Sequence, residues 1–281
     1  MVDLAITTDD LRAGIRSVSL SGIPLCVHSS LRSFGYVKGG GQAIVESLLA
    51  EACTVLVPTF SSEAYEVPPP PGAQLARNGL GGDEPKGAML GVERWYTPDS
   101  SEIDADMGAI PTAVLAMPGR VRSPHPIRSF TAIGSRASDL IPEDATVDLF
   151  GPLKKLAEAD GSVLLMGVGL DKTTAIHLAE QEAGRHMFRR WANGPDRRPV
   201  GMEIGGCSNG FVRLESVLKP LERVTRVGQS VWYVYPAGEL LEAATRAIGE
   251  EPSLTHCSDP QCIRCDDAIM GGPVPLRSED A

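Results

Sequence analysis

One histidine stands near the start of a predicted helix, where it could do acid–base chemistry. His177 lies in the segment Gly167–Glu180 (GVGLDKTTAIHLAE), in which a strand end and a glycine turn lead into a capped helix. This order places His177 at the rim of a parallel sheet, where α/β proteins bind their ligands. A neutral imidazole accepts a proton near pH 7, and a carboxylate on its other nitrogen strengthens it as a base. A histidine in the first turns of a helix also serves structural roles, so the pattern alone leaves both interpretations open.

Two other polar segments have residue types suited to binding an anion. His28–Arg32 (HSSLR) follows a strand-like run and offers hydroxyls, backbone N–H groups and Arg32 for a phosphate or pyrophosphate. Serines in loops also cap helices, so this motif is weak alone. In Arg122–Phe130 (RSPHPIRSF), two prolines fix the backbone around His125 and two arginines flank it. This second segment fits an anionic ligand such as a nucleotide, or equally a rigid surface turn.

The six cysteines fall into two groups. Two lie inside apolar runs and are expected to be buried in the core: Cys26 and Cys53. The remaining four lie in polar surroundings rich in Gly and Asp: Cys207, Cys257, Cys262 and Cys265. In a reducing compartment this pattern favours a metal over disulfides.

The spacing near the end of the chain suggests a zinc site. His256, Cys262 and Cys265 read as H-x5-C-x2-C, and Cys207 supplies a fourth ligand for a tetrahedral Zn²⁺ with three thiolates. Cys257, next to His256, could replace either of its neighbours. The C-x2-C spacing also occurs by chance, so a structural zinc and reduced surface thiols remain alternatives. A zinc ion here would clip the C-terminal segment onto the loop that follows Glu203.

The elements that must position these groups follow the order of a parallel α/β unit: strand, glycine loop, helix, strand. Strands are predicted at 23–27, 54–57, 130–134, 162–168, 199–204, 211–217, 224–227 and 230–235, and helices at 43–52, 107–117, 153–159 and 239–248. We expect a single α/β/α domain over residues 1–270 with a central mixed, partly parallel sheet. Residues 271–281 are expected to be a disordered tail.

Periodicity disappears between residues 61 and 101, where Pro68–Pro71 and many glycines indicate a long irregular insertion. Loops of this length in a compact enzyme are usually lids or binding loops. An excursion without a role is the alternative.

Composition excludes some partners. The 281-residue chain has a formal net charge of −10, which argues against nucleic acid and suits a cationic substrate. No apolar stretch approaches the roughly 20 residues of a membrane span, and the first 15 residues lack the pattern of a signal peptide. We therefore expect a cytoplasmic protein without a membrane partner.

Four segments taken together resemble the aminoglycoside 3-N-acetyltransferase family. They are VHSSLRSFG at 27–35, LVPTFS at 56–61, RSPHPIRSFTAIG at 122–134 and LLMGVGLDKTTAIHLAE at 164–180. The likeness covers most of the chain, and the last two segments are specific. It implies the family's own α/β/α arrangement, which is not the GNAT fold, with a deep cleft between cofactor and antibiotic.

The resemblance also implies the reaction and its residues. Acetyl-CoA would be the donor, and the 3-amino group of the 2-deoxystreptamine ring of an aminoglycoside the acceptor. His177 would be the catalytic base, and Glu203 in VGMEIGGCSNGF the carboxylate that orients it. Seven residues are expected around CoA: Ser29, Ser30, Arg32, Ser123, His125, Phe130 and Thr174. Some family members resemble the zinc arrangement at the same places.

The sequence departs from the family after LVPTFS. Many members carry an acidic residue there that contacts the antibiotic, whereas this chain has SEAYE followed by the insertion, so Glu63 or Glu66 would have to substitute. The acceptor is therefore the least specified part of the reaction. One alternative is an acyltransferase of the same fold that modifies another small amine in biosynthesis, and a second is a CoA-binding protein without catalysis.

Overall fold

The computed structural model describes residues 5–80, 94–141 and 147–275. A seven-stranded sheet in the order β10-β11-β7-β1-β2-β6-β5 forms its centre. Its strands are β1 Pro24–Ser29, β2 Thr54–Pro58, β5 Val121–Arg122, β6 Phe130–Ile133, β7 Ser162–Met166, β10 Arg223–Val227 and β11 Ser230–Pro236. β1 runs parallel to β2 and β7, and the remaining pairs are antiparallel. This confirms the predicted mixed, partly parallel sheet.

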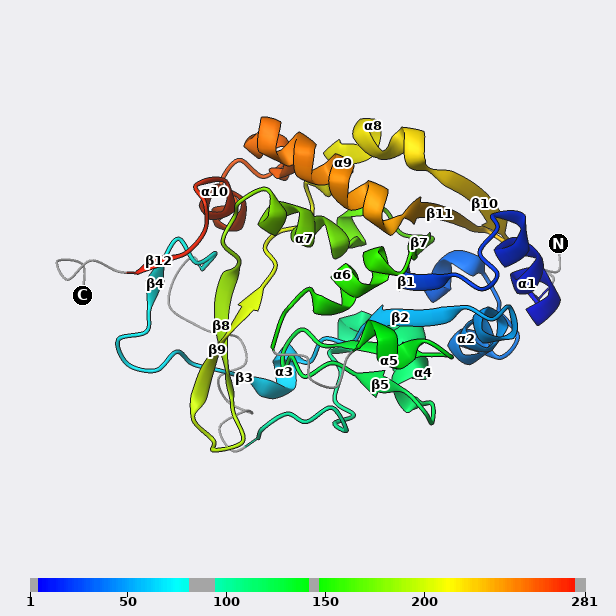
Figure 1. The fold of residues 1–281 in the computed structure, drawn as a ribbon, viewed down its shortest axis with the longest axis horizontal. Helices are drawn as coiled ribbons and strands as arrows, with labels where there is room; N and C mark the ends of the chain where they lie inside the picture. The colour runs from blue at the N-terminus through cyan, green and yellow to red at the C-terminus, as the bar shows by residue number, and fades with distance from the viewer. Residues whose placement is uncertain (1–4, 81–93, 142–146, 276–281) are drawn as a thin grey trace.

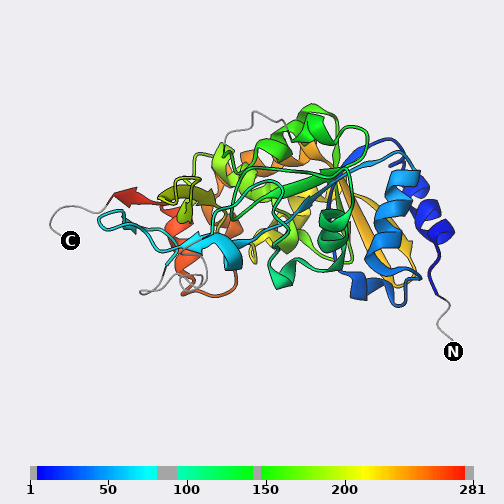
Figure 2. The same cartoon turned by 90° about the horizontal axis from the view of Figure 1, so that it is seen from below.

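Helices cover both faces of this sheet (Figures 1 and 2). One face packs against α1 Thr8–Ser17, α2 Gly40–Ala50 and α4 Ala109–Ala116, and the other against α5 Ala137–Leu140, α6 Gly151–Glu158, α7 Ala175–Glu182 and α9 Ala237–Glu250. Side chains alternate between the two cores along a strand. In β7, Val163 and Leu165 enter the core with α7, whereas Leu164 and Met166 enter the core with α1. The result is the expected three-layered α/β/α arrangement.

Smaller elements lie beside the main sheet. β3 Glu66–Val67, β8 Phe188–Asn193 and β9 Pro199–Ile204 form a three-stranded sheet, and β4 Leu75–Ala76 pairs with β12 Val274–Pro275. The short helices are α3 Ser62–Tyr65, α8 Glu215–Leu218 and α10 Ile263–Ile269. 3-10 turns span Leu31–Phe34, Ala105–Met107, Leu170–Lys172, Phe211–Leu214, Lys219–Leu221 and Pro252–Thr255.

Two expectations about local structure differ from what is observed. The strand predicted at 211–217 is a 3-10 turn followed by α8, because Phe211, Leu214 and Leu218 bury one face at helical spacing. The predicted tail from 271 begins in order, since Val274 and Pro275 pair with β4. Residues 276–281, and the part of the insertion at 81–93, lie outside the described residues.

The described part of the insertion at 61–101 contains α3, β3 and β4. It is held partly by Arg122, whose buried guanidinium donates hydrogen bonds to the carbonyl oxygens of Thr59, Ser100 and Glu102. The described helices include none with both the length and the apolar character that a membrane span requires.

Candidate active site

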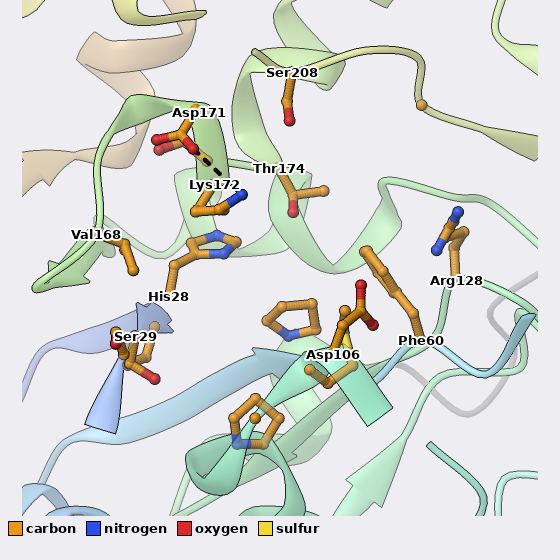
Figure 3. A pocket seen from close by; sticks show the side chains of 18 of the residues that line it. His28, Ser29, Phe60, Asp106, Arg128, Val168, Asp171, Lys172, Thr174 and Ser208 are labelled. Carbon is orange, nitrogen blue, oxygen red and sulfur yellow. Dashed lines mark ion pairs between the residues drawn. The ribbon is translucent and has the colours of Figure 1, made fainter. Parts of the chain in front are cut away.

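A cavity of about 1260 Å³ opens where the three parallel strands end. Ser29 ends β1, Pro58 ends β2 and Gly167 follows β7, and all three residues line the cavity. α/β proteins bind ligands at the carboxyl ends of parallel strands. Figure 3 shows side chains from several of these elements converging on the space. The topology therefore makes this cavity the candidate active site.

A glycine turn carries the chain from β7 toward the catalytic helix. Gly167 has a φ of +67°, and a Cβ atom there would lie 1.8 Å from Oγ of Ser33. Only glycine fits this combination of backbone conformation and close approach. The turn leads through a 3-10 segment into α7, which brings His177 to the cavity wall.

His177 is paired with a carboxylate on its own helix. Its Nδ1 lies 2.8 Å from Oε2 of Glu180, one turn further along α7, and both side chains are buried. Glu180 is held in turn through Oε1, which accepts hydrogen bonds from Arg185 and, at 3.0 Å, from Oγ1 of Thr255. A carboxylate held by a guanidinium is ionised and can only accept, so Nδ1 of His177 carries the proton. Nε2 is then left as a proton acceptor.

The ring of His177 is fixed on two other sides by packing. The ring of Phe211 lies edge-on with its centroid 4.8 Å away. Gly205, in the loop after β9, leaves the space for the ring, because a Cβ atom at this position would lie 2.5 Å from Cδ2 of His177. The imidazole is therefore oriented by a hydrogen bond, an aromatic contact and a close backbone approach.

Glu203 does not fill the role expected from the resemblance. Its carboxylate accepts a hydrogen bond from Nε2 of Gln181 at 3.2 Å, and its carbonyl oxygen accepts one from Nε2 of His125 at 2.8 Å. The partner of His177 is Glu180, because residues three apart on a helix face the same side. The HLAE spacing was the available signal in the sequence.

The residues expected around CoA divide into two sets. Ser29, Ser30, Arg32 and Thr174 line the cavity, as does His28, which was not assigned a role. Burial lowers the pKa of His28 to about 4, so the ring is neutral at pH 7.

The other three, Ser123, His125 and Phe130, are buried and do not line the cavity. His125 accepts a hydrogen bond from the backbone N–H of Arg128 at 2.9 Å and donates to Glu203. Oγ of Ser123 accepts from the N–H of Phe130 at 2.9 Å. The RSPHPIRSF segment thus acts as a rigid turn, the alternative noted above, and Arg128 is the member of it that reaches the cavity.

The acidic residues proposed for the acceptor lie elsewhere. Neither Glu63 nor Glu66 lines the cavity, and Oε1 of Glu66 lies 3.6 Å from Nε of Arg190. Burial raises the pKa of Glu66, against the opposing effect of Arg190. Asp106 is the acidic residue of this region that faces the cavity, together with the basic residue Arg264. Both came to the cavity by tertiary contacts that no local motif announced.

Four cysteines gather beside the loop that holds His177. The Sγ atoms of Cys207, Cys257, Cys262 and Cys265 all lie within 4.8 Å of one another. His256, expected as a ligand, is not in this group: Nδ1 contacts the carbonyl oxygen of Cys257 at 2.8 Å and Nε2 contacts Asp266 at 3.1 Å. The adjacent thiol takes its place, as the sequence allowed, because the backbone turn directs Cys257 inward.

Comparison with known proteins then decides the family. The sequence pattern of the aminoglycoside 3-N-acetyltransferase family matches residues 26–248. The chain belongs to this family. It is similar to aminoglycoside N(3)-acetyltransferase IX of Micromonospora chalcea, with 35% identity over 79% of this chain and 85% of that protein. The family assignment also makes the chain a relative of acyltransferases, as the resemblance implied.

Solved structures share the fold. The apoenzyme of aminoglycoside acetyltransferase AAC(3)-IVa superimposes with a TM-score of 0.77 at 24% identity, covering 96% of this chain and 99% of that one. A binary complex of AAC-IIIb with CoASH gives a TM-score of 0.69 at 22% identity, covering 87% and 96%. AAC(3)-IVa has also been solved with gentamicin, with a TM-score of 0.76 at 23% identity and coverages of 96% and 99%. The predicted antibiotic N-acetyltransferase fold, distinct from GNAT, is thereby confirmed.

Proposed function

We propose that this protein transfers the acetyl group of acetyl-CoA to an amine, with His177 as the general base. The observation that carries the proposal is the buried pair of His177 Nδ1 and Glu180 Oε2 beside a large cavity at the strand ends. A relative with the same fold binds CoASH, which supports CoA as the carrier of the acyl group.

The reaction follows from the protonation state of the ring. The amine nitrogen attacks the thioester carbonyl carbon, a C–N bond forms, and Nε2 of His177 accepts the proton from nitrogen. Glu180 stabilises the imidazolium that results. The C–S bond then breaks, and the departing CoA thiolate takes a proton back from the imidazolium. No acyl-enzyme is needed.

The oxyanion formed during this attack needs hydrogen-bond donors. Two backbone groups expected for this role are already engaged: the N–H of Ser30 donates to the carbonyl oxygen of Met166, and that of Thr173 to Leu170. Thr174, which lines the cavity, remains as the donor we propose.

The acceptor has two candidates. An aminoglycoside is the first, because the similar protein of Micromonospora chalcea is named for that activity and AAC(3)-IVa binds gentamicin. A different small amine is the second. It is favoured by Arg128 and Arg264, two basic side chains that line the cavity.

A structural zinc ion is the further part of the proposal. Four thiols within 4.8 Å of one another match the ligand set of a closed tetrahedral site. The ion would join Cys207, two residues after Gly205, to the C-terminal segment that carries Cys257, Cys262 and Cys265. The expected effect is to hold the loop against which His177 packs.

Replacing His177 tests the reaction. His177→Ala should lower kcat by about 10²- to 10⁴-fold, since the proton of the amine loses its acceptor. Its affinity for CoA, measured by calorimetry, should stay within about threefold of the wild type, because the loss is confined to the proton-transfer step. Thiol release from acetyl-CoA with gentamicin and with small amines measures turnover. Undiminished turnover in His177→Ala would overturn the proposal.

A further inference from the structure

The side chains that line the cavity have opposite chemistry at its two sides. In Figure 3, Ser29, Val168 and Lys172 lie together, while Arg128 and Phe60 lie on the other side, beyond Asp106. Hydroxyls and backbone groups at the β1 end suit the CoA phosphates, and Arg32 and Lys172 supply positive charge there. The side with Arg128 is therefore the place for the acceptor.

Arg128 is a cation without a counter-ion. Its guanidinium stacks on the ring of Phe60, with Cζ 4.7 Å from the ring centroid. Among the described residues, no carboxylate lies within ion-pair distance of it. Burial lowers its pKa, which shows that the guanidinium is largely removed from water.

The acidic groups nearby are committed to other partners. The carboxylate of Glu66 faces Arg190 at 3.6 Å. Asp104 accepts backbone N–H bonds from Ser62 and Glu63, at 3.1 and 2.9 Å. Neither carboxylate is thus free to neutralise Arg128 by direct contact.

A second guanidinium lines the same cavity. Arg264 lies on α10, far from Arg128 in sequence, and forms no ion pair with a described residue. The two like charges repel each other, as the lowering effect of Arg264 on the pKa of Arg128 shows. An anion between them would remove the repulsion and use two planar donor groups that suit carboxylate and phosphate oxygens.

We propose that Arg128 and Arg264 form a subsite for an anionic group, a carboxylate or a phosphate, carried by the amine acceptor. The proposal rests on acyl transfer at His177 but not on an aminoglycoside as acceptor. A polycationic acceptor would bring ammonium groups toward two uncompensated guanidinium groups, whereas an amine that also bears an anion would pair with them. Asp106 on the same wall would then face the reacting end of such a zwitterion.

Matched acceptors test the subsite. Two pairs differ only in the anion: glucosamine 6-phosphate against glucosamine, and γ-aminobutyrate against n-butylamine. With acetyl-CoA and the full-length protein, kcat/KM should be about 10- to 100-fold higher for the anionic member of at least one pair, because charge-assisted hydrogen bonds are lost in the other. The phosphate pair and the carboxylate pair distinguish the two kinds of anion.

Variants show whether the arginines cause the preference. Arg128→Gln and Arg264→Ala should each remove most of it while leaving the KM for acetyl-CoA unchanged. Arg246→Ala, an exposed arginine on α9, serves as the matched control and should keep the preference. Arg264 is itself exposed, so its replacement leaves the core intact.

Several results would overturn the subsite. They are equal kcat/KM within both pairs, a preference that survives both arginine variants, or a raised KM for acetyl-CoA in these variants, which would assign the arginines to the cofactor. Efficient turnover of gentamicin that is unchanged in Arg128→Gln also speaks against it. Failure of the reaction itself looks different: no thiol release with any amine, or full turnover in His177→Ala.

Discussion

Nδ1 of His177 and Oε2 of Glu180 lie 2.8 Å apart on one face of α7, while Glu203 contacts Gln181 instead. Glu180→Gln should therefore lower kcat by about 10²- to 10⁴-fold, because the imidazolium loses its stabilising charge. The matched variant Glu203→Gln should change kcat by less than about threefold. Steady-state thiol release measures both.

A purely structural role for Glu180 would give another result. Removing a carboxylate beside His177 disfavours the imidazolium, so the pH profile of kcat should shift toward lower pH for the base. The variant should also lower Tm, since Arg185 loses its partner. A lower Tm with an unshifted profile, or a larger loss in Glu203→Gln, would contradict the assignment.

Gly205 is predicted to be a positioning residue for the base. In Gly205→Ala the new methyl would lie 2.5 Å from His177 Cδ2, so either the ring or the loop must move. Misplacement of a catalytic group by about 1 Å costs on the order of 10²-fold in rate. We expect kcat to fall by at least about tenfold with little change in CoA affinity.

Gly238→Ala provides the control for this variant. Gly238 is in α9, and a Cβ atom there would meet no other atom within 4 Å. Its replacement should leave kcat unchanged and alter stability by less than about 1 kcal/mol. Equal activity of the two alanine variants would show that the close approach at position 205 has no catalytic consequence.

The cysteine cluster predicts the metal content of the protein. Purified protein should contain one Zn²⁺ per chain by elemental analysis, and Cys257→Ser should lose most of it, because one thiolate of a four-thiolate site is removed. His256→Ala should retain the metal, since both nitrogens of His256 contact other groups. Removal of the metal by a chelator should lower Tm. Zinc retained in Cys257→Ser but lost in His256→Ala would restore the ligand set first expected from the sequence.

Acid should destabilise the fold through two buried histidines. Burial lowers the pKa of His28 and of His125 to about 4, from 6.5. Between these values the unfolded chain binds more protons than the native protein, so stability is full above pH 6.5 and falls as the pH drops toward 4. Each histidine accounts for a loss of the order of 3 kcal/mol across this window.

His125→Gln tests this pH dependence. Glutamine keeps a donor and an acceptor without a titrating group, so the fall in unfolding free energy between pH 6.5 and 4 should become shallower. Urea unfolding at several pH values measures the slope, and His256→Gln is a partly exposed control. An unchanged slope in His125→Gln would mean that this ring does not govern the acid limb.

Local patterns in the sequence were enough to place the catalytic framework. Apolar runs predicted β1, β2 and β7, and the GVGLDKTTAIHLAE segment predicted a glycine turn followed by the helix with His177. The pair of His177 and Glu180 was also within reach of the sequence, since it depends only on helical spacing. Family motifs pointed to Glu203 because the partner of a base is not encoded in the order of the chain.

Tertiary structure alone decided the features that join distant segments. Gly205 meets His177, Arg264 reaches the cavity with Arg128, and Cys257 replaces His256 beside Cys207. Each of these depends on how the loop after β9 and the C-terminal segment pack together. Hydrophobic spacing reports which face of an element is buried, but it carries no information on which distant residue that face will meet.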